Sequence, residues 1–325
     1  MTAPFLRPRR LRENTILRNA ITETYIRPEH LIYPMFVGDI DTPYEIKGMP
    51  GITKYPINEL VNEIEKLVSC GLKSFLIFGT PNNKDAIASA AIEHHGVVPK
   101  ALRAIRKAIG NAALIATDVC LCSYTDSGHC GIIKDGRVDN DSSIDIIAQM
   151  ALTHAQAGAD LVAPSDMMDG RVRCIRELLD ANNFSHTPIM SYAVKYASNL
   201  YGPFRNAADS TPAFGDRRGY QLDYHNRRDA IREAILDEQE GADILMVKPG
   251  VTYLDIIRDL YEHTNLPIAA YQVSGEYAMI RYAAINNAID ERGVVNETWT
   301  AMRRAGAQLI LSYHAAIAIQ ENWLL

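Results

Sequence analysis

The chain has 325 residues, of which 47% are hydrophobic and 22% charged, and its formal net charge is −6. This composition excludes a wholly disordered chain, and the negative charge argues against a global attraction to nucleic acid or an anionic membrane. No run of about 18 apolar residues marks a membrane span, and the N-terminus lacks an apolar signal core. Five cysteines, an odd number, do not suit a secreted disulfide framework. We therefore expect a cytoplasmic protein that acts on a small molecule.

The first 30 residues differ from the rest of the chain. The run from Arg7 to Arg12 is basic and broken by a proline, and no long apolar face follows it before about residue 30. Such a segment is either a solvated tail or an arm that packs on another subunit, and the sequence leaves both open. We assign residues 1–30 to an N-terminal arm and residues 31–325 to a single catalytic domain.

From Leu31 onward the chain repeats one unit, a helical stretch followed by a small turn and a short apolar strand. Gly71, Gly158, Gly241 and Gly306 each stand shortly before an apolar run, where a glycine can cap the preceding helix. The eight apolar runs are 31–37, 74–78, 113–117, 161–163, 188–192, 244–247, 267–271 and 309–311. Most are far enough apart for a crossover helix, which predicts an α/β fold of the (β/α)₈ TIM-barrel type.

An open doubly wound sheet is the alternative fold. It should have a glycine-rich phosphate turn after its first strand, and the residues that follow Val37 do not form one. The barrel fold also predicts the location of the active site, because active sites of such barrels lie at the C-terminal ends of the strands. The polar residues that end or follow the apolar runs are Asp118, Cys120, Ser165, Asp166, Lys195, Lys248, Ser274 and Tyr313.

Three of the five cysteines lie in one stretch, at Cys120, Cys122 and Cys130. If the preceding strand continues, Asp118, Cys120 and Cys122 alternate onto one face, and the glycines that flank Cys130 let the backbone turn back toward them. Three thiolates suit Zn²⁺, and three protein ligands with one open position are typical of a catalytic site. A closed structural site completed by a distant histidine or aspartate is the alternative.

Two lysines end consecutive apolar strands. Lys195 follows the run that begins at Ile189, and Lys248 follows Ile244 to Val247. Loss of water and the charge of a neighbouring cation both lower the pKa of a lysine, and a neutral amine can form a Schiff base with a carbonyl. For one such lysine a salt bridge at the strand end is the alternative. Two of them on adjacent strands beside a thiolate cluster favour catalysis.

The loop from Tyr201 to Gln221 is too long for an ordinary connection, and loops of this length are often lids. Arg205, Arg217 and Arg218 offer guanidinium groups that could hold carboxylates of an anionic substrate. A solvated basic loop is the alternative. Since Lys248 lacks a polar neighbour on its N-terminal side, we expect it to capture substrate first and Lys195 to act only once the lid closes.

Several motifs together resemble the porphobilinogen synthase family, also called 5-aminolevulinate dehydratase. They are 118–124, 128–131, 190–195, 201–205, 246–249 and 271–277, and the resemblance covers essentially the whole chain. It implies a homo-oligomer, usually an octamer, of (β/α)₈ barrels whose N-terminal arms embrace their neighbours. It also implies the reaction, in which two molecules of 5-aminolevulinate condense to porphobilinogen with loss of two waters, a step of tetrapyrrole (haem) biosynthesis.

The resemblance also implies roles for particular residues. Lys248 would form a Schiff base with the substrate that supplies the propionate side, and Lys195 with the one that supplies the acetate side, near zinc held by the three cysteines. The carboxylate-binding residues would be Arg205, Arg217 and Gln221 on the acetate side and Ser274 and Tyr313 on the propionate side.

In many members of this family a glutamate in the helix before the sixth strand holds an allosteric Mg²⁺, largely through water, and the match here is Glu233. A solvent-facing carboxylate is the alternative for this residue. His314 stands where an aromatic residue is common, which leaves the polarity of the pocket open. Two rival functions remain. A class I aldolase needs one Schiff-base lysine and no zinc, and a zinc-stapled binding barrel would hold an anion without turnover.

Overall fold

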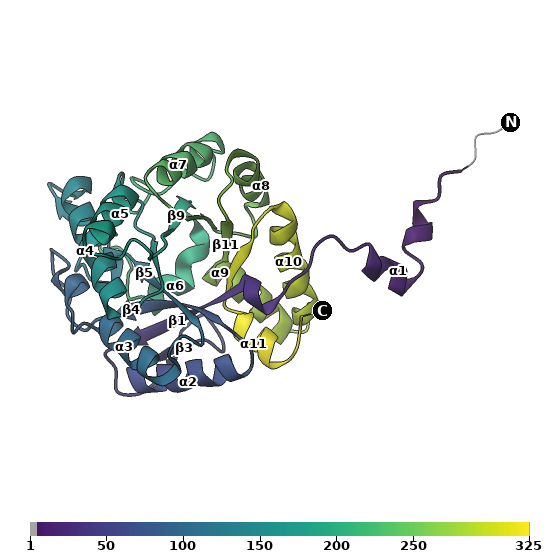
Figure 1. Cartoon of the computed structure of the whole chain (residues 1–325), viewed down its shortest axis with the longest axis horizontal. Helices are drawn as coiled ribbons and strands as arrows, with labels where there is room; N and C mark the ends of the chain where they lie inside the picture. The colour runs from purple at the N-terminus through teal and green to yellow at the C-terminus, as the bar shows by residue number, and fades with distance from the viewer. Residues whose placement is uncertain (1–4, 325) are drawn as a thin grey trace.

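A computed structural model of the chain describes residues 5–324 as a barrel with an extended N-terminal segment (Figure 1). Within these residues eight parallel strands form the barrel. They are β1 (Leu31–Gly38), β4 (Ser74–Thr80), β5 (Leu114–Val119), β8 (Leu161–Pro164), β9 (Met190–Lys195), β10 (Ile244–Lys248), β11 (Ile268–Gln272) and β12 (Leu309–Ser312). The strand order is β8-β5-β4-β1-β12-β11-β10-β9, and a bridge between Val162 and Ile189 joins its two ends. The predicted (β/α)₈ fold is confirmed.

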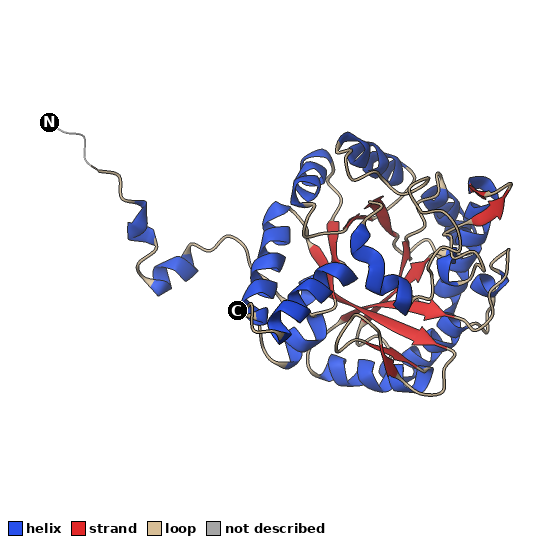
Figure 2. Ribbon diagram, turned by 180° about the vertical axis from the view of Figure 1, so that it is seen from behind, coloured by secondary structure: helices blue, strands red, loops and turns tan. Residues whose placement is uncertain are grey.

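Helices surround the strands on the outside of the barrel (Figure 2). The outer helices are α2 (Ile57–Ser69), α3 (Val97–Ile109), α4 (Asn140–Ala157), α5 (Arg171–Ala181), α7 (Arg228–Gln239), α8 (Leu254–His263), α10 (Glu291–Ala305) and α11 (Ala315–Gln320). Gly158 caps α4 with φ 110° and Gly306 caps α10 with φ 132°, in a region of backbone space that favours glycine. At α2 and α7 the expected glycines, Gly71 and Gly241, come one residue after the C-cap residue and have φ 106° and 103°.

Shorter elements lie at the barrel ends and in the connections. They are α1 (Thr15–Ala20), α6 (Gly202–Ala207), β2 (Tyr44–Glu45), β3 (Thr53–Tyr55), the hairpin of β6 (Ile132–Lys134) and β7 (Arg137–Asp139), and the 3₁₀ turns η1 (Pro8–Leu11), η2 (Pro28–His30), η3 (Ser89–Ile92), η4 (Leu121–Ser123) and η5 (Asn199–Tyr201). A longer helix, α9 (Ser274–Ile285), follows β11 and precedes α10. Two of the shorter elements, η4 and α6, follow the C-terminal ends of β5 and β9 and contribute to the candidate site.

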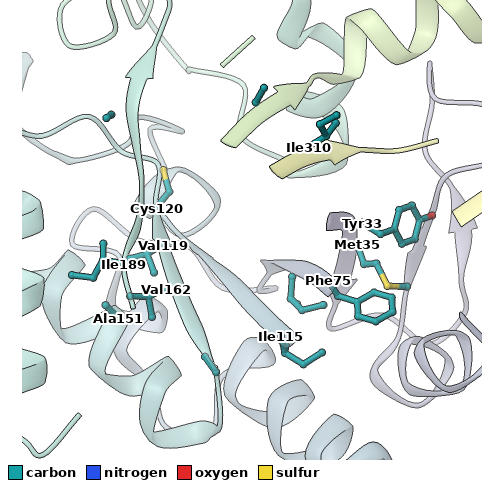
Figure 3. Close-up of a cluster of buried hydrophobic side chains, with 14 of the residues drawn as sticks. Tyr33, Met35, Phe75, Ile115, Val119, Cys120, Ala151, Val162, Ile189 and Ile310 are labelled. Carbon is teal, nitrogen blue, oxygen red and sulfur yellow. The ribbon is translucent and has the colours of Figure 1, made fainter. Parts of the chain in front are cut away.

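The strands are buried on both faces, as expected of a parallel sheet wrapped by helices. On β4, Phe75 and Ile77 belong to the outer cluster between strands and helices, whereas Leu76 and Phe78 belong to the cluster inside the barrel. Part of the outer cluster, including Val119 and Cys120, appears in Figure 3. Because side chains alternate along a strand, every second residue near a strand end faces the barrel interior, where a substrate can be enclosed.

One irregularity changes this alternation on β9. Leu245 of β10 pairs with Ser191, but Val247 pairs with Val194, so β9 contains one extra residue over the same span. This bulge reverses the direction of the side chains that follow it. Lys195 consequently pairs in register with Lys248. In a regular strand every second side chain points to the same face. Without the bulge, Lys195 would therefore point to the same face of β9 as Ser191, which contacts the helices.

A buried ion pair holds the outer face of β9. Arg171, at the start of α5, donates from Nη1 and Nη2 to the two carboxylate oxygens of Asp237 on α7, at 3.1 and 2.9 Å. Ser191 of β9 donates to the same carboxylate and accepts from Arg171. Each of the three side chains thus has a charged or polar partner, which a buried ion pair requires. The network ties β9 to two helices.

The N-terminal arm extends away from the barrel in both views of the whole chain (Figures 1 and 2). Neither η1 nor α1 has a buried residue, and the side chains of Phe5, Leu6 and Ile16 are 85, 93 and 80% exposed. Residues 1–4 of the expected arm, and Leu325 at the end of the expected domain, lie outside the described residues. Within 5–324, none of the helices is long and apolar enough to cross a membrane.

Candidate active site

Two buried lysines stand side by side at the C-terminal end of the barrel. Lys195 is the last residue of β9 and Lys248 the last of β10, and each is 4% exposed. Lys195 Nζ donates a hydrogen bond to the main-chain oxygen of Ser165, which follows β8. The sequence-based expectation that both amines meet at one end of the barrel therefore describes their position correctly.

Aromatic rings surround the Lys248 amine. Its Nζ lies 4.5 Å from the ring centre of Tyr271, 4.8 Å from Phe204, 5.0 Å from Tyr192 and 5.4 Å from Tyr201. Rings exclude water but offer only weak attraction to a cation. Burial, and then the charge of Lys195, lower the pKa of Lys248 to about 7. About half of the Lys248 amine is then neutral at pH 7, and a neutral amine is a nucleophile.

Asp118, near the end of β5, is the acidic neighbour of the two lysines. Burial raises the pKa of Asp118 to about 6, although a hydrogen bond with Ser165 and the charges of both lysines lower it. One of its oxygens, Oδ1, is buried without a hydrogen-bond partner in the described part of the chain. A carboxyl group with this pKa can hold or release a proton near neutral pH. Asp166, by contrast, faces Arg171, at 3.7 Å, on the helix side of the strands.

The three clustered cysteines are buried, and their sulfur atoms lie within 4.8 Å of one another. All are free thiols. The expected alternation continues only as far as Cys120, which is extended, because the chain then enters the turn η4 that contains Cys122. The turn, not a longer strand, brings Cys122 to Cys120. Gly128 has φ 68°, and a Cβ there would lie 2.4 Å from the Thr211 carbonyl oxygen, so the return of the chain to Cys130 requires a glycine.

This donor set fits a zinc ion. At a Zn–S distance of about 2.3 Å, the sulfurs of a tetrahedral site lie roughly 3.8 Å apart, a separation that the cluster allows. Hydrogen bonds from Cys120 and Cys122, and the charges of Arg217 and Lys195, lower the pKa of Cys130, although burial opposes them. Within residues 5–324 no fourth His, Cys, Asp or Glu joins the cluster. Both ring nitrogens of His129 have other partners, namely Tyr220 and Phe214.

Residues 199–222, which we call the lid, connect β9 to the segment before α7 and include η5 and α6. Phe204 of α6 packs against Phe36 and Phe78 in the barrel, with ring centres 5.8 and 5.1 Å apart. The lid therefore covers the end of the barrel at which both lysines lie. The long loop expected between the lysines is present, and a short helix orders its first half.

The lid side chains singled out by the sequence have buried polar atoms without partners. These atoms, among residues 5–324, are Nε of Arg205, Nε of Arg217 and both amide atoms of Gln221. Burial, and then the charge of Arg217, lower the pKa of Arg205, so the two cations lie near each other without a carboxylate between them. Buried polar groups are normally satisfied, and such a concentration of unsatisfied donors indicates a place for an anion. Arg218 is exposed and stays outside this group.

Ser274 and Tyr313 lie on the opposite side of Lys248 from Lys195, at the ends of β11 and β12. Both are buried. Ser274 Oγ accepts from the Phe204 backbone at 3.0 Å, which links the start of α9 to the lid, and the Tyr313 hydroxyl lies 2.9 Å from that of Tyr271. His314, next to Tyr313, contacts Gln272 and Glu291, at 3.3 and 3.4 Å. Its polar ring therefore belongs to a group of polar side chains on the side of β12 that faces away from the barrel interior.

Glu233 on α7 is half-buried and lies away from the lysines. It lines a cleft of about 710 Å³ together with Asp169, Asp229 and part of the lid. Burial raises the pKa of Glu233, and Asp237 and Asp169 raise it further, whereas Arg171 lowers it. Within residues 5–324 its ligand atoms do not join those of two other acidic groups in a compact cluster. The cleft can hold a cation only with most of that cation's water retained.

The rings around Lys248 and the bulge that turns Lys195 inward were not predicted from the sequence. Tyr192 and Tyr271 could have been found, since each stands at an inward-facing position near the end of a strand. The bulge has no comparable signal, because the segment 190–195 contains neither a glycine nor a proline. The Ser165 carbonyl that accepts from Lys195 is a main-chain group, which a residue pattern cannot reveal.

Comparisons with known proteins agree over the whole chain. A family model described as delta-aminolevulinic acid dehydratase matches residues 5–321. The delta-aminolevulinic acid dehydratase of Bacillus subtilis is 47% identical over 325 residues, covering 100% of this chain and 99% of that protein. The one from Staphylococcus epidermidis is 50% identical over 314 residues, covering 96% and 97%. A solved Toxoplasma gondii enzyme in complex with the product porphobilinogen superposes with TM-score 0.96 and 41% identity, covering 99% of this chain and 92% of that one.

The pKa of about 7 makes the reactivity of Lys248 testable. Its neutral fraction rises as the pH passes through 7, so labelling by a trace of acetic anhydride should be about tenfold faster at pH 8 than at pH 6 and then level off. Peptide mass spectrometry measures this. Exposed lysines are the internal control, and their labelling should still increase at pH 9. A Lys248 rate that also keeps climbing above pH 9 would contradict the lowered pKa.

Proposed function

This chain belongs to the delta-aminolevulinic acid dehydratase family, and we propose that Lys195 and Lys248 perform the family's reaction through two Schiff bases. The enzyme is a lyase, a porphobilinogen synthase of tetrapyrrole (haem) biosynthesis. In that reaction two molecules of 5-aminolevulinate condense to porphobilinogen and two waters leave. The observation that best supports our assignment is the register pairing of two buried lysines beside a cluster of three thiols.

Lys248 is the residue that we propose captures the first substrate. Its neutral amine would attack the keto carbon, and the carbinolamine would lose its oxygen as water to give the Schiff base. The aromatic rings around Lys248 exclude water, which disfavours the ammonium form of this lysine in the free enzyme and so favours attack by the neutral amine. The protonated Schiff base again places a cation among the ring faces, where Tyr192 and Tyr271 would stabilise it.

Lys195 would form the second Schiff base, on the acetate-side substrate. Its hydrogen bond to the Ser165 oxygen fixes the amine beside Asp118, which is suited to accept and return a proton. The carboxylate of this substrate would lie among Arg205, Arg217 and Gln221, whose unpaired atoms would then be satisfied. Closure of the lid would thus complete the second subsite and exclude water from both.

Ser274 and Tyr313 would hold the carboxylate of the propionate-side substrate. The Tyr313 hydroxyl can donate to a carboxylate while it accepts from Tyr271, and Ser274 Oγ can exchange its long, 3.3 Å bond to the Leu200 oxygen for one to the ligand. The first subsite therefore needs little rearrangement. Because Ser274 also accepts from Phe204, binding at this subsite would act on the lid directly.

Borohydride trapping with 5-aminolevulinate tests the two lysines. Lys248→Met should abolish turnover and most of the trapped adduct, because the first amine is lost. Lys195→Met should abolish turnover yet retain a single adduct at Lys248, located by peptide mass spectrometry. Lys66→Met, at an exposed position on α2, is the control and should leave both adduct and turnover intact.

Three results would contradict the assignment. A first adduct on Lys195, with normal trapping in Lys248→Met, would reverse the proposed order of capture. One adduct with full turnover in Lys195→Met would indicate single-lysine chemistry of the class I aldolase kind. Binding of 5-aminolevulinate without any adduct or product would indicate a zinc-stapled binding barrel.

We further propose that Cys120, Cys122 and Cys130 hold a catalytic Zn²⁺ beside the second subsite. When bound, zinc supplies a Lewis acid that polarises an oxygen of the substrate or lowers the pKa of a bound water. The convergence of three buried thiols, with His129 engaged elsewhere, supports three protein ligands and one open position. The closed structural site therefore lacks a fourth protein donor among the described residues.

Removal of the metal should stop turnover and leave the barrel folded. The cysteines lie in the loop after β5 and pack against the edge of the core, but the strands and helices of the barrel supply most of that core, so circular dichroism and melting should change little. Cys130→Ser should reduce bound zinc and lower kcat by more than about 100-fold, since even indirect neighbours of a metal ligand cost 10–100-fold. Cys70→Ser, at an exposed thiol, is the matched control. Wholesale unfolding on zinc loss at room temperature would favour a structural ion.

Mg²⁺ is proposed as a second, allosteric ion near Glu233. Mg²⁺ usually retains several waters and takes one or two carboxylates, which agrees with a half-buried glutamate facing a cleft shared with Asp169 and Asp229. The cleft also contains lid residues, so an ion there would be able to influence lid position. Activity measured against Mg²⁺ should lose its dependence in Glu233→Gln, and unchanged activation in that variant would refute the assignment.

The homo-octamer and the cytoplasmic location also belong to the proposal. The exposed apolar side chains of the arm supply a surface that a neighbouring subunit would bury. Five free cysteines, three of them in one cluster, suit the reducing cytoplasm. Cell fractionation with an antibody to the chain tests the location, and recovery in an extracellular or membrane fraction would refute it.

Deletion of residues 1–25 should yield smaller particles, because the arm has no core of its own and becomes ordered by packing on a partner. Light scattering gives the particle mass. The melting temperature of the deleted protein serves as the control that its barrel is folded. An octamer of unchanged stoichiometry would show that assembly does not need the arm.

A further inference from the structure

The lid rests on the loop that contains the three cysteines. We call residues 120–131 the cysteine loop. The contacts between the two segments are the bonds from Ala213 N to the Ser127 oxygen at 2.8 Å, from Ser123 Oγ to the Ala208 oxygen at 2.9 Å and from Arg217 Nη2 to the Gly128 oxygen at 2.9 Å. The close approach of Gly128 to Thr211 leaves no space for a side chain. The second half of the lid, from residue 208 to residue 220, is therefore seated on the cysteine loop.

His129 and Tyr220 form the most specific of these contacts. His129 is 4% exposed, and its Nε2 lies 3.0 Å from the Phe214 carbonyl oxygen, which can only accept. In a neutral imidazole, Nδ1 then accepts, so the Tyr220 hydroxyl at 3.0 Å donates to it. The same hydroxyl accepts from the backbone N–H of Cys130, at 3.4 Å. One directed chain of hydrogen bonds thus runs from a candidate metal ligand through two side chains to the lid backbone.

Neither residue has an assigned part in the reaction. Tyr220 is next to Gln221, but its hydroxyl is directed at the cysteine loop and not at the lysines. His129 neighbours Cys130, but both of its nitrogens are used by the lid. Their geometry has a consequence for both segments. A shift of the cysteine loop would break the bonds to Tyr220 and Phe214, and an open lid would remove the protein partners of the imidazole and of the Cys130 amide.

We propose that Tyr220 and His129 are positioning residues that latch the lid to the cysteine loop, so that metal binding at the cysteines and lid closure over Lys195 favour each other. This inference rests on the proposed zinc site and lid. Coupling of this kind is reciprocal, because a metal that fixes the loop stabilises the closed lid and a closed lid raises the affinity for the metal by the same factor. The latch would assemble the second subsite only when the metal is present.

The test uses the full-length, zinc-loaded protein under a thiol reductant, with Tyr220→Phe as the variant that removes one hydroxyl. Tyr224→Phe is the matched control, because Tyr224 follows the lid, is 45% exposed and donates no hydrogen bond within residues 5–324. Hydrogen exchange of the lid peptide that contains Ala213 reports closure, since this amide bonds directly to the cysteine loop. Competition with a chromophoric chelator measures zinc affinity, and borohydride trapping measures the Lys248 adduct.

In the unsubstituted protein, zinc removal should speed exchange of the lid peptide, and Tyr220→Phe should show fast exchange even with zinc bound. Its zinc affinity should fall about tenfold, within the usual range of coupling between sites. Its KM should rise while trapping at Lys248 stays normal, because Lys248 belongs to the barrel. His129→Phe, which keeps a ring in contact with Phe214 and Tyr220 but removes both nitrogens, should behave in the same way.

Lid exchange that ignores zinc in the unsubstituted protein would overturn the proposal, as would a Tyr220→Phe variant with the exchange and zinc affinity of Tyr224→Phe. Failure of the proposed function has a different signature. The unsubstituted chain would then bind no zinc at its cysteines or make no product, whereas the difference in lid exchange between Tyr220→Phe and Tyr224→Phe would persist, since that difference needs only the hydrogen bonds.

Discussion

The repulsion between two amines in one water-poor space is the interaction on which the rest of this site depends. A buried lysine prefers to lose its proton, and a second lysine nearby strengthens that preference. The register pairing of Lys195 with Lys248 places both amines at one end of the barrel, and the rings of Tyr192 and Tyr271 keep water away without supplying a counter-ion of full charge. The neighbouring carboxyl, Asp118, is itself buried and has a raised pKa, so it compensates the amines only in part.

Such a site needs a rigid frame, because the amines would separate if the frame allowed it. The barrel supplies this frame through parallel strands whose ends cannot move independently. On β9 the frame is reinforced from behind by Arg171 and Asp237, which bond to each other and to Ser191. A buried ion pair adds little net stability by itself, but the directed hydrogen bonds of such a network favour a single arrangement. Here that arrangement includes the bulge that turns Lys195 inward.

The lid differs from the lysine site, because several of its buried hydrogen-bond donors lack an acceptor. Arg205, Arg217 and Gln221 have buried atoms without partners, which costs free energy that an anionic ligand would recover. The lid nevertheless lies against the barrel, since Phe204 packs on barrel rings and Tyr220 bonds to the cysteine loop. The site is thus prepared electrostatically for a carboxylate at the lid and for a carbonyl at the lysines. Under the proposed function, these two parts of the site would hold two different parts of one substrate.

The sequence by itself determined the fold class and the kinds of chemical groups present. Eight apolar runs with capping glycines predicted the barrel, and the rule that barrel sites lie at strand ends brought Lys195, Lys248 and Cys120 to one end of the molecule, where they are found. The tertiary structure alone decided which way these side chains point. The bulge on β9 and the turn at Cys122 arise from packing and hydrogen bonds with distant segments, and neither has a local signal. The same holds for the contact of His129 with Tyr220, 91 residues apart, because a hydrogen bond between loops depends on where the strands beneath them end.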